Sequence, residues 1–211
     1  MKPGIFLCFL LSILTSPCRA QKDCDLKLDK DSVKIWTCPS ANSKYKSVRS
    51  TFIMKGYPSQ LAALVLDFEN HKKWQYKTKS ASLLKKVDDR HYIYYTDIDA
   101  PVVSDRDFVI DMKFSQDPKT KVLTIDLVSV PDYIPPKQGL VRVPFSKAQW
   151  SVKEIGKGLL QIDYFIELDL GGSVPAWIVN TFAHQGPHET YKGMHDFIRK
   201  YPKGKVAFVK D

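Results

Sequence analysis

Apolar and polar residues alternate with a period of two along much of the middle of the chain. The alternation occupies residues 91–100, 108–114, 122–128, 148–153 and 159–170. In the first of these segments Tyr94 and Ile98 share one phase, and Asp97 and Asp99 share the other. Because successive side chains of a strand point to opposite faces, each segment has one apolar and one polar face. The pattern predicts an antiparallel sheet whose apolar side curves around something.

Two further strands, over residues 31–38 and 44–54, are predicted before a helix that begins at Pro58 and ends near Asn70. A second helix is predicted over residues 173–201, with an apolar stripe that faces the apolar side of the sheet. Since proline interrupts the hydrogen bonding of a helix, we expect a kink at Gly186-Pro187. We expect His71 to be a cation at the C-terminal end of the first helix rather than a catalytic base.

The length and the first twenty residues indicate one exported domain. With 211 residues and 44% hydrophobic composition, the chain is long enough for one substantial core, and no linker or repeat divides it. Residues 1–20 have the features of a secretory signal, and the apolar run over residues 5–14 is too short to span a bilayer comfortably. We therefore predict a domain over residues 24–203 in a periplasmic or secreted protein.

Export changes the interpretation of the cysteines and of the charge. Cys24 and Cys38 remain after signal removal, and in an oxidising compartment we expect them to form a disulfide; two free thiols would fit only a chain that is not exported. Loss of Lys2 and Arg19 lowers the formal charge by two, from +9 to +7. Because the lysines are spread out and the chain is exported, the charge favours transient contact with an anionic membrane surface, not nucleic acid.

Four stretches of the chain together resemble the StAR-related lipid-transfer (START) family. They are ENHKKWQYKTKSASLLKKV (69–87), APVVSDRDFVIDM (100–112), SVPDYIPPKQGLVRV (129–143) and DLGGSVPAWIVN (169–180). The resemblance implies an α+β helix-grip fold of the START/Bet v 1 type. In that fold a curved antiparallel β-sheet wraps a long C-terminal α-helix and encloses a hydrophobic cavity for one lipid or sterol.

The charged turn over residues 104–107 is then expected to be structural. Arg106, flanked by Asp105 and Asp107, would fix the shape of the turn, and a headgroup contact by Arg106 at the cavity mouth is the alternative. Some sterol-binding members carry an acid and an arginine inside the cavity. The matching positions here are Thr96 and Met112, which implies a more apolar cavity with hydroxyl groups as its polar contacts.

The inward phase of the strands and the stripe of the last helix predict the residues that line the cavity. The predicted ligand-binding residues are Tyr94, Thr96, Ile110, Met112, Leu127, Trp150, Tyr164, Ile166, Phe182 and Phe197. Tyr92 is a further candidate hydroxyl. A door to the membrane is expected at the loop 130–139 and near Trp177, where Tyr133 and Ile134 could contact lipid and Lys137 headgroups. An ordinary proline-stiffened loop is the alternative.

Catalytic and metal chemistry find little support in the sequence. No serine lies in a nucleophile-elbow motif, and no glycine-rich phosphate loop is present, so we expect no catalytic residues and no cofactor. His184, His188 and His195 extend over roughly 16 Å of helix, too far to meet at one ion, so no metal site is expected. Two alternatives remain: a helix-grip cyclase or hydrolase, and an interaction module whose cavity is filled by residues such as Phe108, Phe114 and Trp150.

Overall fold

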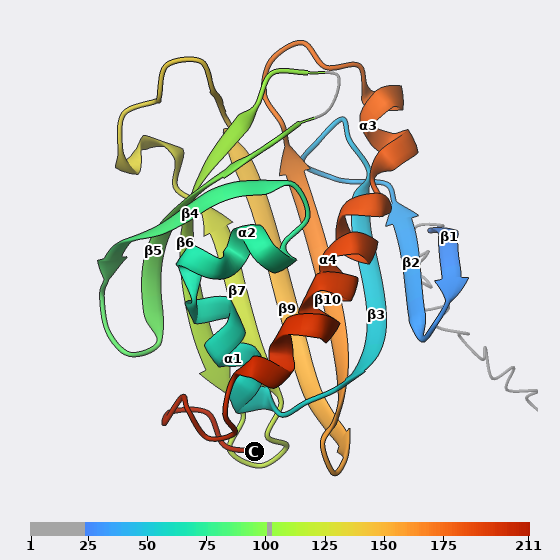
Figure 1. Cartoon of the computed structure of the whole chain (residues 1–211). Helices are drawn as coiled ribbons and strands as arrows, with labels where there is room; N and C mark the ends of the chain where they lie inside the picture. Colours follow the sequence, from blue (N-terminus) through green and yellow to red (C-terminus); the bar gives the residue numbers. More distant parts are fainter. Residues whose placement is uncertain (1–23, 101–102) are drawn as a thin grey trace, which may run out of the picture.

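A strongly curved sheet forms the body of the protein. The computed structural model describes residues 24–100 and 103–211. The strands are β1 (Asp25–Lys30), β2 (Val33–Cys38), β3 (Ser47–Lys55), β4 (Thr78–Lys86), β5 (His91–Ile98), β6 (Arg106–Gln116), β7 (Leu123–Ser129), β8 (Val141–Arg142), β9 (Phe145–Gly156) and β10 (Leu159–Asp169). Their order is β1-β2-β3-β10-β9-β7-β6-β5-β4, with the short β8 paired to β6 (Figure 1). The five predicted alternating segments are confirmed as strands.

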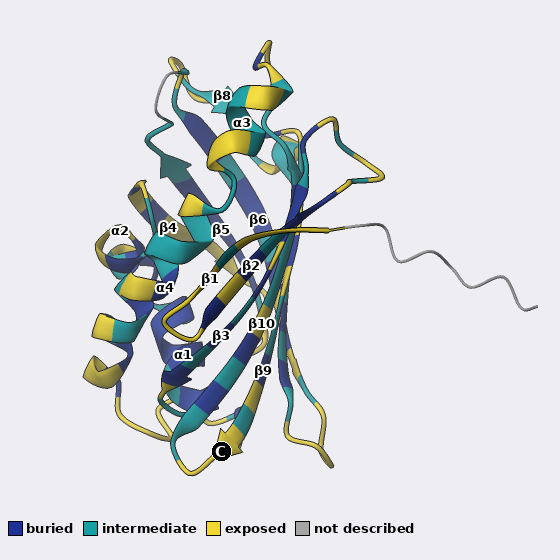
Figure 2. Ribbon diagram, turned by 90° about the vertical axis from the view of Figure 1, so that its right-hand side faces the viewer, coloured by how far each residue is buried: buried dark blue, intermediate teal, exposed yellow. Residues whose placement is uncertain are grey.

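The helices all lie on the concave side of this sheet (Figures 1 and 2). They are α1 (Pro58–Leu66), α2 (His71–Trp74), α3 (Ala176–Phe182) and α4 (Gln185–Phe197), with short 3-10 turns at η1 (Phe68–Asn70), η2 (Pro131–Tyr133) and η3 (Ile198–Lys200). The arrangement is the predicted helix-grip fold. Within the described residues, none of the helices has the length and apolar character needed to cross a membrane.

The first helix ends earlier than predicted. α1 stops at Leu66, and Asp67 has non-helical backbone angles that separate α1 from η1 and α2. The Asp67 carboxylate accepts hydrogen bonds from Asn70 Nδ2 at 2.8 Å and from the Tyr201 hydroxyl at 2.9 Å. Such side-chain bonds compete with helix continuation, and one of these comes from a residue distant in sequence.

The last helix is divided, and the division falls before the predicted Gly186-Pro187 kink. α3 ends at Phe182 and α4 begins at Gln185. A proline ring clashes with the carbonyl four residues earlier, which for Pro187 belongs to Ala183. The interruption therefore lies one turn ahead of the proline that causes it.

Helix α4 approaches α2 so closely at Gly193 that a residue with a side chain would not fit there. A Cβ atom added to Gly193 would lie 2.2 Å from the backbone oxygen of Trp74 and 2.7 Å from its Cα. Beside this contact, Thr190 Oγ1 accepts a hydrogen bond from the backbone N–H of Tyr76 at 3.1 Å. The glycine thus fixes α2 and α4 together above the concave face.

The N-terminal hairpin carries the predicted disulfide. Cys24 and Cys38 are bonded, which ties the residue before β1 to the last residue of β2. This confirms the expected pairing. The predicted signal segment, residues 1–20, lies outside the described residues.

Candidate functional site

A cavity of about 650 Å³ lies between the concave face of the sheet and the helices α3 and α4. Strands β5, β6, β9 and β10 supply its floor, and residues of α2, α3 and α4 form its cover. Ligand sites in proteins have volumes of about 300–1,000 Å³, so this cavity has the size of a binding site for one small molecule.

Most of the predicted ligand-binding residues line this cavity. The eight that do so are Tyr94, Thr96, Ile110, Leu127, Trp150, Tyr164, Ile166 and Phe182. Met112 does not: it has no exposed surface and belongs to the same packed core as Leu61 and Leu64 of α1. Phe197 is also outside the lining, packed beside the core with the Lys200 ammonium 3.6 Å from its ring centroid. The periods of strands and helices predict the face on which a residue lies. They do not predict what packs over that residue, which is why these two predictions differ from the structure.

Two of the predicted hydroxyl groups, those of Tyr94 and Tyr164, line the cavity and form no hydrogen bond with a described residue. Burial raises the pKa of both phenols above the ordinary value, so both stay protonated at neutral pH. The other two predicted hydroxyls are already in use. Thr96 Oγ1 donates to the Ser80 carbonyl at 3.0 Å, and Tyr92, which does not line the cavity, donates to the Asp89 carbonyl at 2.7 Å.

His71 is buried and uncharged, contrary to the expectation of a helix C-terminal cation. Its side chain is 2% exposed and begins α2 instead of ending the first helix. Nε2 lies 2.8 Å from the Val65 carbonyl, and because a carbonyl only accepts, Nε2 carries the proton. Burial lowers the pKa of His71 to about 4. Nδ1 is therefore a free acceptor, since it has no partner within the described structure.

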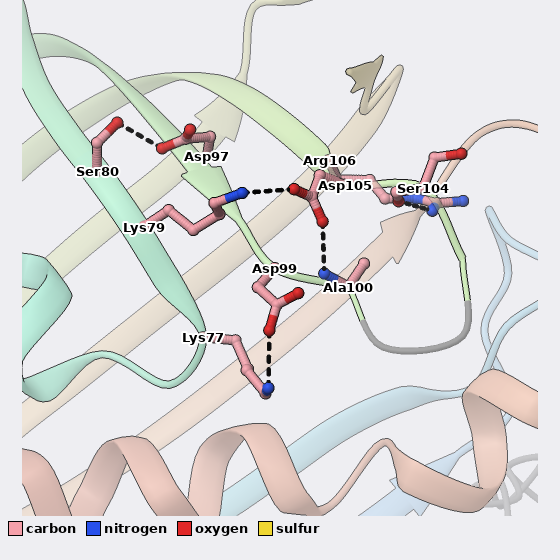
Figure 3. A network of polar contacts seen from close by, with 9 residues as sticks. All are labelled: Lys77, Lys79, Ser80, Asp97, Asp99, Ala100, Ser104, Asp105 and Arg106. Carbon is pink, nitrogen blue, oxygen red and sulfur yellow. Dashed lines mark hydrogen bonds and ion pairs between the residues drawn. The ribbon is translucent and has the colours of Figure 1, made fainter. Parts of the chain in front are cut away.

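The charged residues of the lining lie at the mouth of the cavity, which we define by Lys46, Lys77, Asp99 and Phe182. Their side chains are substantially exposed, and Lys77 Nζ contacts Asp99 at 2.7 Å (Figure 3). Lys46 forms an ion pair with Asp25 at 2.5 Å. Each charge at the mouth is thus already compensated by an opposite charge on the protein.

The charged turn that precedes β6 is held by partners from three different segments. Asp105 pairs with Lys79 at 2.7 Å, which lowers the pKa of Asp105, while Arg106 donates to the Ser104 carbonyl (Figure 3). Asp107 is fully buried and pairs with Arg142. Arg106 therefore contacts neither flanking carboxylate, because alternate residues of an extended chain point to opposite faces. Nor is Arg106 among the residues that line the cavity.

Arg142 holds the loop after β7, a role that the sequence analysis did not assign. Its guanidinium donates two hydrogen bonds of 2.9 Å to the Asp107 carboxylate, and others to the carbonyls of Pro131 and Ile134. Ile134 packs on a small convex-face cluster that includes Tyr95. The loop expected to act as a door is thereby held on the side of the sheet away from the cavity. A salt-bridged pair 35 residues apart leaves no local signal in the sequence.

Helix α3 stands at the mouth instead. Ile178, Val179 and Phe182 of this helix line the cavity. Trp177 is 71% exposed and Phe182 is 50% exposed. Of the two predicted door elements, only the one around Trp177 adjoins the cavity.

Two histidines of the last helix lie beside a neighbouring carboxylate. His188 lies 3.5 Å from Glu189, and His195 lies 3.5 Å from Asp196. Over residues 24–100 and 103–211, no cluster of His, Cys, Asp and Glu could hold a metal ion.

Comparison with known proteins gives a consistent result. The model of the START domain family matches residues 27–204. An uncharacterized protein of Pseudomonas aeruginosa is 31% identical over 180 residues, which cover 85% of this chain and 88% of that protein. The phosphatidylcholine transfer protein of Rattus norvegicus is 28% identical over 151 residues, 69% of each chain.

A solved structure has the same fold. The crystal structure of a STAR-related lipid transfer protein from Xanthomonas axonopodis superposes with a TM-score of 0.77 at 25% identity, covering 83% of this chain and 98% of that one. The family match extends over β1 to α4 and over every element that lines the cavity. This chain belongs to the START domain family.

Proposed function

We propose that the protein is a carrier that binds one hydrophobic small molecule, a lipid or a sterol, in the cavity beneath α3 and α4. The observation that carries the proposal is a cavity of about 650 Å³ whose lining is mainly aliphatic and aromatic. Burial of about 300 Å² of apolar ligand surface would contribute roughly 7 kcal/mol. Two relatives have names that agree with this role: the phosphatidylcholine transfer protein of Rattus norvegicus and the STAR-related lipid transfer protein of Xanthomonas axonopodis.

Exchange of the ligand would take place at the membrane through α3. Trp177 and Phe182 are exposed on a helix that has no buried residue, and Phe182 also lines the cavity. An aromatic side chain of this kind can enter the headgroup region while the helix moves aside.

We place this carrier outside the cytoplasm, in the periplasm or the extracellular space. The Cys24–Cys38 disulfide supports this location, because disulfides persist in oxidising compartments. The mature surface would keep the basic charge that suits a membrane contact.

The test is native mass spectrometry of the protein purified from its own compartment, followed by organic extraction and identification of the bound molecule. We expect a lipid or sterol at near one-to-one stoichiometry. An empty protein that also fails to bind a broad panel of lipids and sterols would contradict the carrier. The helix-grip enzyme is the rival, and it predicts that the bound molecule is chemically converted on incubation, whereas a carrier returns it unchanged.

A further inference from the structure

Two buried polar atoms of the cavity lining, His71 Nδ1 and Trp74 Nε1, have no hydrogen-bond partner in the described structure. The hydroxyls of Tyr94 and Tyr164 belong to the same lining and form no hydrogen bond with a described residue. The His71 ring centroid lies 5.0 Å from that of Trp74 and 5.8 Å from that of Tyr94. Polar groups in a protein interior are nearly always hydrogen-bonded, so a group of unpartnered ones in a cavity indicates a site for a polar atom.

The reachable members of this group are the two tyrosine hydroxyls. Both residues line the cavity, although Tyr94 as a whole is only 4% exposed, whereas His71 Nδ1 and Trp74 Nε1 are enclosed by protein atoms. Tyr94 comes from β5 and Tyr164 from β10, and the Trp150 ring packs at 5.2 Å against the Tyr164 ring. Each hydroxyl can donate one hydrogen bond and accept another.

The same part of the cavity carries no charge. Burial keeps Tyr94 and Tyr164 protonated and His71 neutral at pH 7. The charged lining residues Lys46, Lys77 and Asp99 lie at the mouth. An ionised ligand group placed between the tyrosines would lose its water without meeting a counter-charge, which is costly.

We infer that the cavity selects an uncharged ligand with a hydroxyl or carbonyl group, and that this group hydrogen-bonds to Tyr94 and Tyr164 while the apolar remainder fills the rest of the cavity. This inference deepens the proposed function and rests on it. It excludes ligands whose buried end is anionic, such as a free carboxylate.

Three probes with one alkyl chain test the inference: 1-decanol, decane and decanoate. Their binding is followed at neutral pH by tryptophan fluorescence, because Trp74 and Trp150 both line the cavity. In Tyr94→Phe and Tyr164→Phe we expect the affinity for 1-decanol to fall about two- to tenfold, the value of one hydrogen bond, and the affinity for decane to stay constant. Decanoate should bind the wild type more weakly than 1-decanol.

Tyr92→Phe is the matched control, because it removes the same atom from the same strand at a hydroxyl that points out of the cavity to Asp89. It should leave all three affinities unchanged, and thermal unfolding verifies that each variant is folded. The inference is overturned if Tyr94→Phe and Tyr164→Phe leave the affinity for 1-decanol unchanged, as when water alone satisfies the hydroxyls. Equal losses for all three probes, or tightest binding of decanoate, also overturn it.

The two proposals fail in different ways. If the wild type binds none of the three probes and yields no bound molecule on extraction, the carrier and this inference fall together. If the wild type yields a bound lipid but the two tyrosine variants do not discriminate between the probes, only the inference about the hydroxyls falls.

Discussion

The space between the sheet and its helices is packed at one end and hollow at the other, although the same strands pass through both. On β6, Met112 and Phe114 are buried in the packed end, whereas Phe108 and Ile110 line the cavity. These four residues share one phase of one strand. The side-chain pattern of the sheet is therefore the same at both ends, and the difference arises from what covers it.

The covering helices differ in how firmly they are anchored. Seven of the nine residues of α1 are buried, and the C-terminal segment adds Val206 and Val209 to the same core. None of the seven residues of α3 is buried. Since local stability follows the amount of buried apolar contact, α1 and α3 belong to opposite ends of the stability range, with the cavity under the weaker one.

The largest expected effect on stability comes from replacing one large side chain by alanine at each end of β6. Met112→Ala should lower the free energy of unfolding by about 2–5 kcal/mol, because it opens a void in a filled core. Ile110→Ala should cost clearly less, since its side chain already borders the cavity. Urea denaturation of both variants measures the difference. Equal losses would mean that the cavity end is as tightly packed as the other.

The next effect concerns the contact that holds α4 against α2. Gly193→Ala should destabilise the fold by about 1–3 kcal/mol, because the added methyl group overlaps the Trp74 backbone. Gly186→Ala on the same helix is the control: its Cβ would meet only Tyr76, at 3.9 Å. A Gly193→Ala protein as stable as the Gly186→Ala protein would contradict the close approach.

A third effect depends on pH and on His71, a buried residue of the cavity lining. Its folded pKa of about 4 is below the ordinary histidine value of about 6.5, so the unfolded chain takes up a proton first as the pH falls. The stabilisation is complete above pH 6.5 and is lost as the pH falls toward 4. Between pH 7.5 and pH 5 the loss should be about 2 kcal/mol.

Denaturation of wild type and His71→Gln at both pH values measures this contribution. The wild type should lose more stability than the variant, in which the titrating group is absent. The same pH dependence in both proteins would show that His71 is not held neutral in the fold.

The smallest effect on stability is expected at α3. Trp177→Ala should change the free energy of unfolding by less than about 0.5 kcal/mol, because its side chain is mostly exposed. The Trp177→Ala protein should bind vesicles of phosphatidylcholine and phosphatidylserine about tenfold more weakly than the wild type, as measured by co-sedimentation. Tyr133→Ala, on the convex loop, is the control and should leave vesicle binding intact. If Tyr133→Ala weakens vesicle binding more than Trp177→Ala, the membrane contact lies on the convex face.

The strands and their faces could be predicted from the sequence because each position depends on a local period. The phase of the alternation alone predicts that Tyr94, Thr96 and Ile110 face the cavity. Met112 and Phe197 show the limit: they lie on the right face, but a helix or a core cluster distant in sequence determines whether space remains above them. Whether a cavity or another side chain lies above a residue of the sheet depends on the packing of the whole fold.

Polar partners were harder to predict than faces. The charged turn does not indicate which partners its acids take, and Asp105 and Asp107 bind Lys79 and Arg142. The expectation that His71 is a cation at a helix end is wrong for a similar reason, because its burial follows from the break at Asp67, which the Tyr201 hydroxyl helps to fix. In each case the deciding partner is more than twenty residues away.

The strand order also governs when the sheet can be completed. β3 pairs with β10, so that Ile53 lies opposite Gln161, and β10 alone joins the three N-terminal strands to the remaining strands of the sheet. Before β10 docks, β1, β2 and β3 can pair only with one another, and β10 follows β3 by about a hundred residues along the chain. Closing so long a loop is entropically costly and slow, which makes the docking of β10 the step at which the cavity first acquires its second wall.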